Sequence, residues 1–257
     1  MTIAGIHIET AGTGDPVLLI HGLALDGRMW DDQFPVFAAT HRVIRFDLPG
    51  SGRSAVPTGP WSLAATARDV LEACGVARAH VVGLSLGGQA ATDLALACPH
   101  MVRSLVLIDA AVGGHRFTGE WRMRMKQTIE AAARDGTPLA NERWLADPIF
   151  APAMRSPALA HRLRAMLLDY SGAQWKHPGW MAPVAPPTID RLGEIVAPTL
   201  VIVGALDLPD FQVIADTLAT GIPGARKVVL ADTGHMANME SPQAVNRLMR
   251  EFWQSVP

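Results

Sequence analysis

Short runs of Val, Ile and Leu alternate with helix-like stretches along most of this 257-residue chain, and each run is bounded by Gly, Pro or Asp. Most of the runs are continuously apolar, which is typical of parallel strands covered by helices on both faces. The predicted strands are residues 17–20, 43–46, 80–83, 105–108, 199–203 and 227–230. The predicted helices are residues 63–73, 86–97, 211–220 and 242–253. This alternation predicts an α/β fold with right-handed crossovers between the strands.

Both ends of the chain carry local signals. Residues 3–9 alternate in polarity and precede a turn-like stretch, which predicts an antiparallel edge strand or hairpin. Near the other end, Ser241 is a natural N-cap for the last predicted helix. Pro242 suits the first position of that helix, because the N–H that proline lacks would be unpaired there.

The alternation stops between residues 112 and 198. Within this segment residues 120–134 and 157–169 look helical, whereas residues 175–187 are too rich in proline for regular structure. A structureless loop of this length is unusual in a compact domain. We therefore predict a helical cap, or lid, of residues 112–198 that is inserted into a core domain of residues 1–111 and 199–257.

The predicted cap contains four of the seven tryptophans in the chain. Two interpretations of its apolar side chains stay open. Either they only pack the cap itself, or they line a hydrophobic pocket, for which Trp121 and Trp144 are candidate substrate contacts.

The strongest chemical signal is Gly83-Leu84-Ser85-Leu86-Gly87, which stands directly between a predicted strand and a predicted helix. A G-x-S-x-G sequence in that context is a nucleophile elbow. Ser85 would occupy a strained backbone conformation, and side chains at the two glycines would collide with the neighbouring strand and helix. The helix would also direct its free N–H groups toward the serine. Ser85 is therefore predicted to be a catalytic nucleophile.

A serine hydroxyl needs a base within hydrogen-bond reach, and His235 is the candidate. It follows the last predicted strand, and the carboxyl ends of parallel strands are where active-site groups collect. Met236, the next residue, is a third candidate for substrate contact.

An acid that orients the histidine should complete the set. Asp207 follows the predicted strand 199–203, so the chain order is Ser85, Asp207, His235, the order typical of α/β-hydrolases. Asp210 and Asp109 are alternatives, since each also lies close to the end of a predicted strand.

Developing negative charge in the reaction requires hydrogen-bond donors. The backbone N–H groups of Leu23 and Leu86 are the predicted oxyanion hole, one after the first buried strand and one after the serine. His21 is expected to brace its loop by hydrogen bonding rather than to act in catalysis. The Gly-rich stretch 47–54 lacks the Gly-Lys-Ser/Thr ending of a phosphate loop and predicts only a tight turn.

The charge, the cysteine count and the apolar stretches of the chain indicate which partners and which cellular compartment to expect. With 22 Lys and Arg against 24 Asp and Glu the net charge is −2, which argues against a nucleic-acid binder. The two cysteines support neither a disulfide framework nor a metal site. No signal peptide and no apolar stretch of membrane-spanning length is recognisable. We expect a cytoplasmic monomer or small homo-oligomer without membrane contact, acting on a small molecule.

Taken together, His21-Gly22, the 47–54 turn, the Gly83–Gly87 elbow, Gly204–Asp207 and Gly234-His235 resemble the α/β-hydrolase superfamily over nearly the whole chain. The core is similar to 3-oxoadipate enol-lactonases and small carboxylesterases. The resemblance implies a mostly parallel sheet of about eight strands, a lid after the sixth strand and no cofactor or metal. It also implies acyl transfer to water with Ser85 as nucleophile, His235 as base and then acid, and Asp207 as its orienting acid.

The expected function is therefore hydrolysis of a small ester or lactone through a covalent acyl-enzyme (a carboxylesterase or lactonase, EC 3.1.1). Two enzymatic alternatives use the same three residues, namely C–C bond hydrolysis and cofactor-free perhydrolysis. A third alternative, from another class, is a receptor of hydrolase fold that binds a ligand without turning it over.

Overall fold

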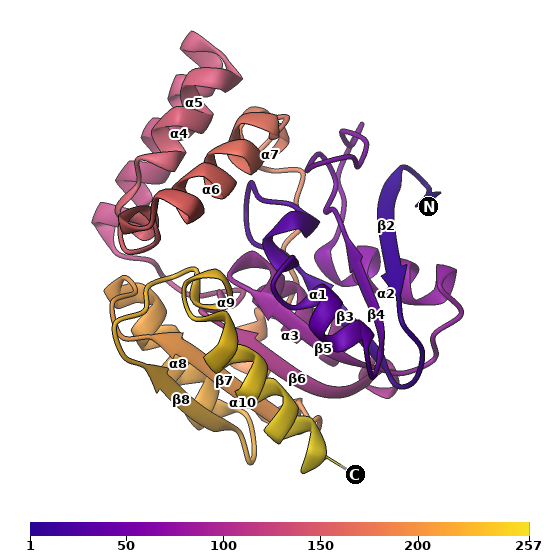
Figure 1. The fold of residues 1–257 in the computed structure, drawn as a ribbon. Helices are drawn as coiled ribbons and strands as arrows, with labels where there is room; N and C mark the ends of the chain where they lie inside the picture. Colours follow the sequence, from indigo (N-terminus) through magenta and orange to yellow (C-terminus); the bar gives the residue numbers. More distant parts are fainter. Residues whose placement is uncertain (257) are drawn as a thin grey trace.

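The structure, a computed structural model, describes residues 1–256 and contains one sheet of eight strands (Figure 1). The spatial order is β1-β2-β4-β3-β5-β6-β7-β8. The strands are β1 (Thr2–Ile3), β2 (Ile6–Ala11), β3 (Pro16–Ile20), β4 (Arg42–Phe46), β5 (Ala79–Leu84), β6 (Val102–Ile108), β7 (Thr199–Gly204) and β8 (Arg226–Leu230). β1 and β2 form an antiparallel hairpin at one edge, and the other six strands are parallel, which confirms both predictions.

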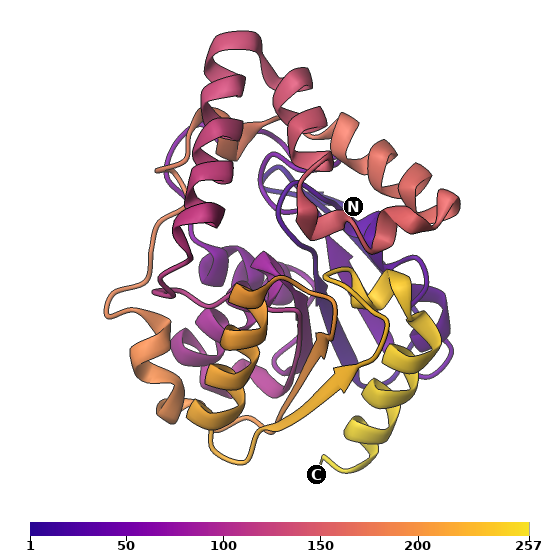
Figure 2. The ribbon, with the colours of Figure 1, turned by 90° about the vertical axis from the view of Figure 1, so that its left-hand side faces the viewer.

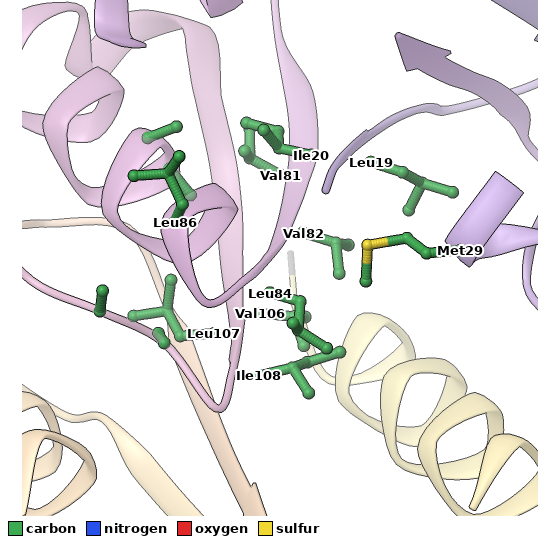
Figure 3. Close-up of a cluster of buried hydrophobic side chains, with 14 of the residues drawn as sticks. Leu19, Ile20, Met29, Val81, Val82, Leu84, Leu86, Val106, Leu107 and Ile108 are labelled. Atoms are coloured by element: carbon green, nitrogen blue, oxygen red, sulfur yellow. The ribbon is translucent and has the colours of Figure 1, made fainter. Parts of the chain in front are cut away.

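The central strands are buried on both faces, as their continuous apolar runs predict. Every residue of β5 and of β7 is buried. Figure 3 shows part of this core, in which Leu19, Val82 and Val106 come from three adjacent strands and lie near Met29. Removing this apolar surface from water is the main stabilising contribution to such a sheet.

Helices cover both faces of the sheet. On one face α2 (Leu63–Ala73) contacts α3 (Leu86–Ala97), and the short 3-10 helix η5 (Thr188–Glu194) contacts both α3 and α8 (Pro209–Gly221). The other face carries α1 (Phe34–Ala38) and α10 (Pro242–Gln254), joined by a contact between the rings of Phe37 and Trp253 at 4.8 Å. Figure 2 shows α8 and α10 on opposite sides of the sheet. Three further short elements are η1 (Gly27–Trp30), η2 (Pro99–Met101) and α9 (Ala237–Glu240).

The start of α10 differs from the prediction in one respect. Ser241 occupies the N-cap position and Pro242 the first turn, but the serine side chain makes no capping hydrogen bond. Its hydroxyl lies instead 2.8 Å from the hydroxyl of Thr233, in the loop that precedes His235. The serine side chain therefore bonds to the loop before His235 instead of capping α10, the role that the sequence favours.

Most of residues 112–198 form a group of helices above the carboxyl edge of the sheet (Figures 1 and 2), whereas the last helix of the segment, η5, packs against α3 and α8 on one face of the sheet. We call this segment the insert; its helices are α4 (Gly119–Asp135), α5 (Thr137–Leu145), η3 (Pro148–Phe150), η4 (Ala153–Arg155), α6 (Pro157–Asp169) and α7 (Ala173–Lys176), followed by η5. The predicted helices at 120–134 and 157–169 are confirmed. The helix α5 was missed because Gly136, with φ of 92°, separates it from α4 by a single residue. The prediction of an irregular segment at 175–187 is wrong at its start, where residues 175 and 176 belong to α7.

None of the helices within residues 1–256 combines the length and the apolar character that a membrane crossing requires.

The buried side chain of His80, on β5, should make the free energy of unfolding depend on pH. Burial lowers the pKa of this side chain to about 4, and Nδ1 lies 2.7 Å from the hydroxyl of Ser104. Because the unfolded chain binds a proton near pH 6.5 and the folded protein does not, the free energy of unfolding falls as the pH drops between those two values. We expect this histidine to contribute a loss of about 2 kcal/mol between pH 7 and pH 5.

Urea unfolding of His80→Leu at the two pH values measures this contribution, and the variant should lose less stability on acidification than the wild type. His100→Leu is the matched control, since His100 is exposed. An unchanged pH dependence in His80→Leu would contradict the assignment.

Candidate active site

Ser85 lies at the tip of a sharp turn, between the last residue of β5 and the first residue of α3. Its backbone angles are φ 54° and ψ −118°, a region that residues with a Cβ rarely occupy. Strain of this kind persists only where the surrounding structure enforces it, and it is common at functional sites.

The glycines on either side permit this turn. A Cβ on Gly83 would lie 2.0 Å from the carbonyl oxygen of Gly87, and a Cβ on Gly87 would lie 2.1 Å from the carbonyl oxygen of Ile20 on β3. Gly88, one residue into the helix, would place a Cβ 2.3 Å from that of Ala110. The predicted collisions at the elbow are therefore confirmed, and they involve backbone atoms that cannot move independently of the sheet.

His235 and Asp207 meet at the ends of the two neighbouring strands β8 and β7. His235 Nδ1 lies 2.8 Å from Asp207 Oδ2, and both side chains are almost completely buried. The second carboxylate oxygen of Asp207 accepts a hydrogen bond from the N–H of Leu208 at 2.7 Å. Since a carboxylate can only accept, Nδ1 carries the proton and Nε2 of the neutral ring is left as an acceptor. The ring of Phe211 packs 4.2 Å from the imidazole and helps to hold its orientation.

The two alternative acids have other partners. Asp210 accepts from both the N–H and the hydroxyl of Thr118, at 2.9 and 2.8 Å, and its Oδ1 lies 3.3 Å from His115 Nε2. It therefore connects the start of α8 to the insert.

Asp109, which is completely buried, accepts from the N–H of Gly204 at 2.8 Å and from that of Ala237 at 3.2 Å. Burial, with the nearby negative charge of Asp207, raises the pKa of the Asp109 carboxyl well above its usual value. Asp109 thus ties together the loops that carry Asp207 and His235 and is not hydrogen-bonded to His235 within residues 1–256.

The two predicted oxyanion donors flank the serine. A Cβ on Gly22 would lie 3.5 Å from the Cβ of Ser85, so the loop that contains Leu23 passes directly beside the elbow. Within residues 1–256 neither the N–H of Leu23 nor that of Leu86 donates to another protein group. Both donors are consequently available to a ligand.

His21 holds that loop in place, as expected. Its Nε2 accepts from the N–H of Leu48 at 2.8 Å, so Nδ1 donates to the carbonyl of Gly22 at 2.8 Å. Burial lowers the pKa of His21, which favours the neutral ring that these two bonds require. The loop is therefore braced against the 47–54 turn, where Gly50 and Gly52 adopt positive φ.

Ser85 and His235 line one cavity of about 260 Å³ between the sheet and the insert, together with Leu23 and Leu86. Trp121, Trp144 and Met236 also line it. In the described part of the chain the serine hydroxyl and the histidine are not hydrogen-bonded to each other. Catalytic hydrogen bonds are commonly long in ligand-free enzymes and tighten when substrate binds.

Sequence reasoning missed several residues of this cavity. Four additional aromatic side chains line it: Phe117, Phe150, Trp175 and Phe211. Two amides, Gln89 and Gln174, are also in its wall. The only signal for them was the aromatic content of the insert, which does not say which rings face inward; Trp180, for instance, stacks on His177 at 3.7 Å and is not part of the wall.

The elbow geometry predicts that Gly87→Ala destabilises the protein severely, by more than about 3 kcal/mol, because the new methyl group meets the backbone of β3. Gly119→Ala is the matched control, since a Cβ there has no neighbour within 4 Å. Thermal unfolding of both variants compares them, and a Gly87→Ala protein as stable as the control would refute the steric argument.

The sequence of residues 15–242 matches the family described as alpha/beta hydrolase fold. A protein of Azorhizobium caulinodans, provisionally assigned as the carbamate hydrolase RutD, is 30% identical and aligns over 97% of this chain and 95% of its own. The 2-hydroxy-6-oxononadienedioate/2-hydroxy-6-oxononatrienedioate hydrolase of Burkholderia vietnamiensis is 32% identical, over 96% of this chain and 90% of its own.

Among solved structures, a thermophilic esterase from Thermogutta terrifontis superimposes with a TM-score of 0.82 and 29% identity, covering 98% of this chain and 93% of the esterase. The match over residues 15–242, the 30% identity over nearly the whole chain and the superposition lead to one conclusion: the chain belongs to the alpha/beta hydrolase fold family and is a hydrolase.

Proposed function

We propose that this protein is a serine hydrolase that cleaves a small ester or lactone through a covalent acyl-enzyme. The observation that carries the proposal is the hydrogen bond between His235 Nδ1 and Asp207 Oδ2, in a site whose cavity also contains Ser85. A nucleophile, a base and a group that orients the base are the requirements for acyl transfer by a serine.

In the first half-reaction the Ser85 hydroxyl oxygen attacks the substrate carbonyl carbon, and His235 Nε2 takes the hydroxyl proton. The carbonyl oxygen becomes an anion that the N–H groups of Leu23 and Leu86 stabilise. When the intermediate collapses, the C–O bond to the alcohol breaks, and the leaving oxygen receives the proton from His235. Asp207 keeps the imidazole in the required tautomer and stabilises its transient positive charge.

In the second half-reaction a water molecule attacks the acyl-enzyme, and His235 again accepts a proton. Collapse releases the carboxylic acid and returns the proton to the Ser85 oxygen. The same imidazole thus accepts and returns each transferred proton, and the enzyme is restored at the end of the cycle.

C–C bond hydrolysis is the second candidate, and the 32% identity to the Burkholderia vietnamiensis hydrolase favours it. The same three residues would serve, with a carbon leaving group in place of an alcohol. Comparing turnover of simple esters with that of vinylogous 1,5-diketones separates the two, and negligible ester turnover would favour the second. A ligand receptor would turn over neither.

Ser85→Ala should lower kcat by at least about 10⁴-fold, because no other group replaces the nucleophile. The melting temperature should stay close to that of the wild type, since the hydroxyl contributes little packing. Labelling by a fluorophosphonate followed by peptide mapping should place the label on Ser85. An active wild-type enzyme that takes no label at this residue would count against the proposal.

Asp207→Asn should lower kcat by about 10⁴-fold while the protein stays folded, because an amide no longer fixes the imidazole tautomer or stabilises its charge. Asp210→Asn is the matched control and should retain kcat within a few-fold, since its contacts are with Thr118 and His115. Steady-state kinetics on both variants tests the assignment, which fails if the control loses as much activity as Asp207→Asn.

A further inference from the structure

The wall of the cavity is uncharged. Among the described residues that line it, none is Arg, Lys, Asp or Glu. Besides Ser85, His235 and the tryptophans, its polar side chains are the amides Gln89 and Gln174. A carboxylate on the substrate would have to leave water without a cationic partner, which is strongly unfavourable in an apolar site.

The arginines of the neighbouring helices do not supply that cation, because each of them either pairs with another side chain or is exposed. On α4, Arg124 pairs with Asp147 at 2.9 Å, and Arg122 is exposed. On α6, Arg162 pairs with Asp32 at 2.7 Å. The remaining partners within α4, α5 and α6 are Asp135 for Arg134, Gln127 for Arg143 and Glu142 for Arg164.

Gln174 supplies one directed polar contact in this apolar wall. The Tyr170 hydroxyl accepts from the N–H of Gln174 at 2.8 Å and makes a second, short hydrogen bond with Gln174 Oε1. The hydroxyl donates its one proton to Oε1, so the carbonyl end of the amide faces Tyr170 and the NH₂ end is left as a donor. Nε2 donates to no other residue within 1–256, so its N–H groups are available to a bound molecule.

We infer that the substrate is an uncharged ester or lactone whose apolar acyl chain carries a neutral hydrogen-bond acceptor for Gln174, and that the cavity excludes substrates with a free carboxylate. This inference rests on the proposed function and specifies its substrate class. At roughly 30 Å³ per water-sized group, the cavity of about 260 Å³ has room for about nine such groups, which suits the acyl part of a small ester. The site thus differs from what the name of the Burkholderia vietnamiensis relative indicates, a dioate substrate with two carboxylates.

Three 4-nitrophenyl esters of matched chain length test the inference. Their acyl groups are octanoate, adipate whose second carboxyl is a methyl ester (methyl adipate), and adipate whose second carboxyl is free (free adipate). We expect kcat/KM for the free adipate ester to be at least about 100-fold below that of its methyl ester, because only the former buries an unpaired charge. Methyl adipate should exceed octanoate by about 5-fold through the hydrogen bond to Gln174. Values for free and methylated adipate that agree within 3-fold would overturn the inference.

Variants of Met125 and Gln174 test whether the uncharged wall and the Gln174 amide cause these preferences. Met125→Arg adds a cation to the wall of the cavity and should raise kcat/KM for free adipate relative to methyl adipate at least about 10-fold, whereas Met125→Leu keeps the wild-type ratio. Gln174→Met should remove the advantage of methyl adipate over octanoate. Each readout is a ratio of two substrates on one protein, so a partial loss of folding does not mimic it. A Met125→Arg ratio equal to that of Met125→Leu, or an unchanged preference in Gln174→Met, would overturn the corresponding part of the inference.

Two fluorophosphonate probes, one ending in the methyl ester of the methyl adipate substrate and one in the carboxylate of the free adipate substrate, distinguish failure of the inference from failure of the proposed function. Faster labelling of Ser85 by the methyl ester tail than by the carboxylate tail supports the inference even if deacylation is slow. Equal labelling rates overturn the inference alone. No labelling and no ester turnover overturn the proposed function and the inference with it.

Discussion

The close contact between β3, β5 and α3 around Ser85 is the constraint on which the site depends. Gly83 and Gly87 bring backbone atoms so near that no side chain fits between them, and the chain must turn sharply at Ser85 with positive φ. Because β5 and residues 17–20 of β3 are buried, the turn cannot relax without disturbing the sheet. The strain is therefore maintained by the core, and it presents the hydroxyl to the cavity below the insert.

Two buried carboxyls near each other have separate roles because their environments differ. Within residues 1–256 the hydrogen-bond partners of Asp109 are backbone N–H groups, and burial raises its pKa. Asp207 is hydrogen-bonded to His235, whose protonated form would balance the negative charge of the carboxylate. Asp109 holds the two loops together, while Asp207 orients the base that we assign to catalysis.

The insert gives the site its chemical character. Its aromatic rings close a cavity over Ser85, and three of its arginines, Arg124, Arg162 and Arg164, pair with acids outside that cavity. The fold of the core alone is compatible with many substrates, since fold does not determine function. The neutral wall with one oriented amide at Gln174 is the basis for the substrate class we infer.

Local sequence determined the strands, most helices and the elbow, because a buried parallel strand needs a continuous apolar run and the turn at Ser85 needs glycines at fixed spacing. Asp109, Asp207 and Asp210 could not be separated in this way, since all three lie near strand ends; only the packing of β7 against β8 brings Asp207 to His235. The lining of the cavity, the side chain of Ser241 bonded to Thr233 and the partners of the arginines were likewise decided by tertiary structure. Such contacts join residues of different helices, strands and loops, and neither hydrophobic periodicity nor local spacing indicates which of these residues meet.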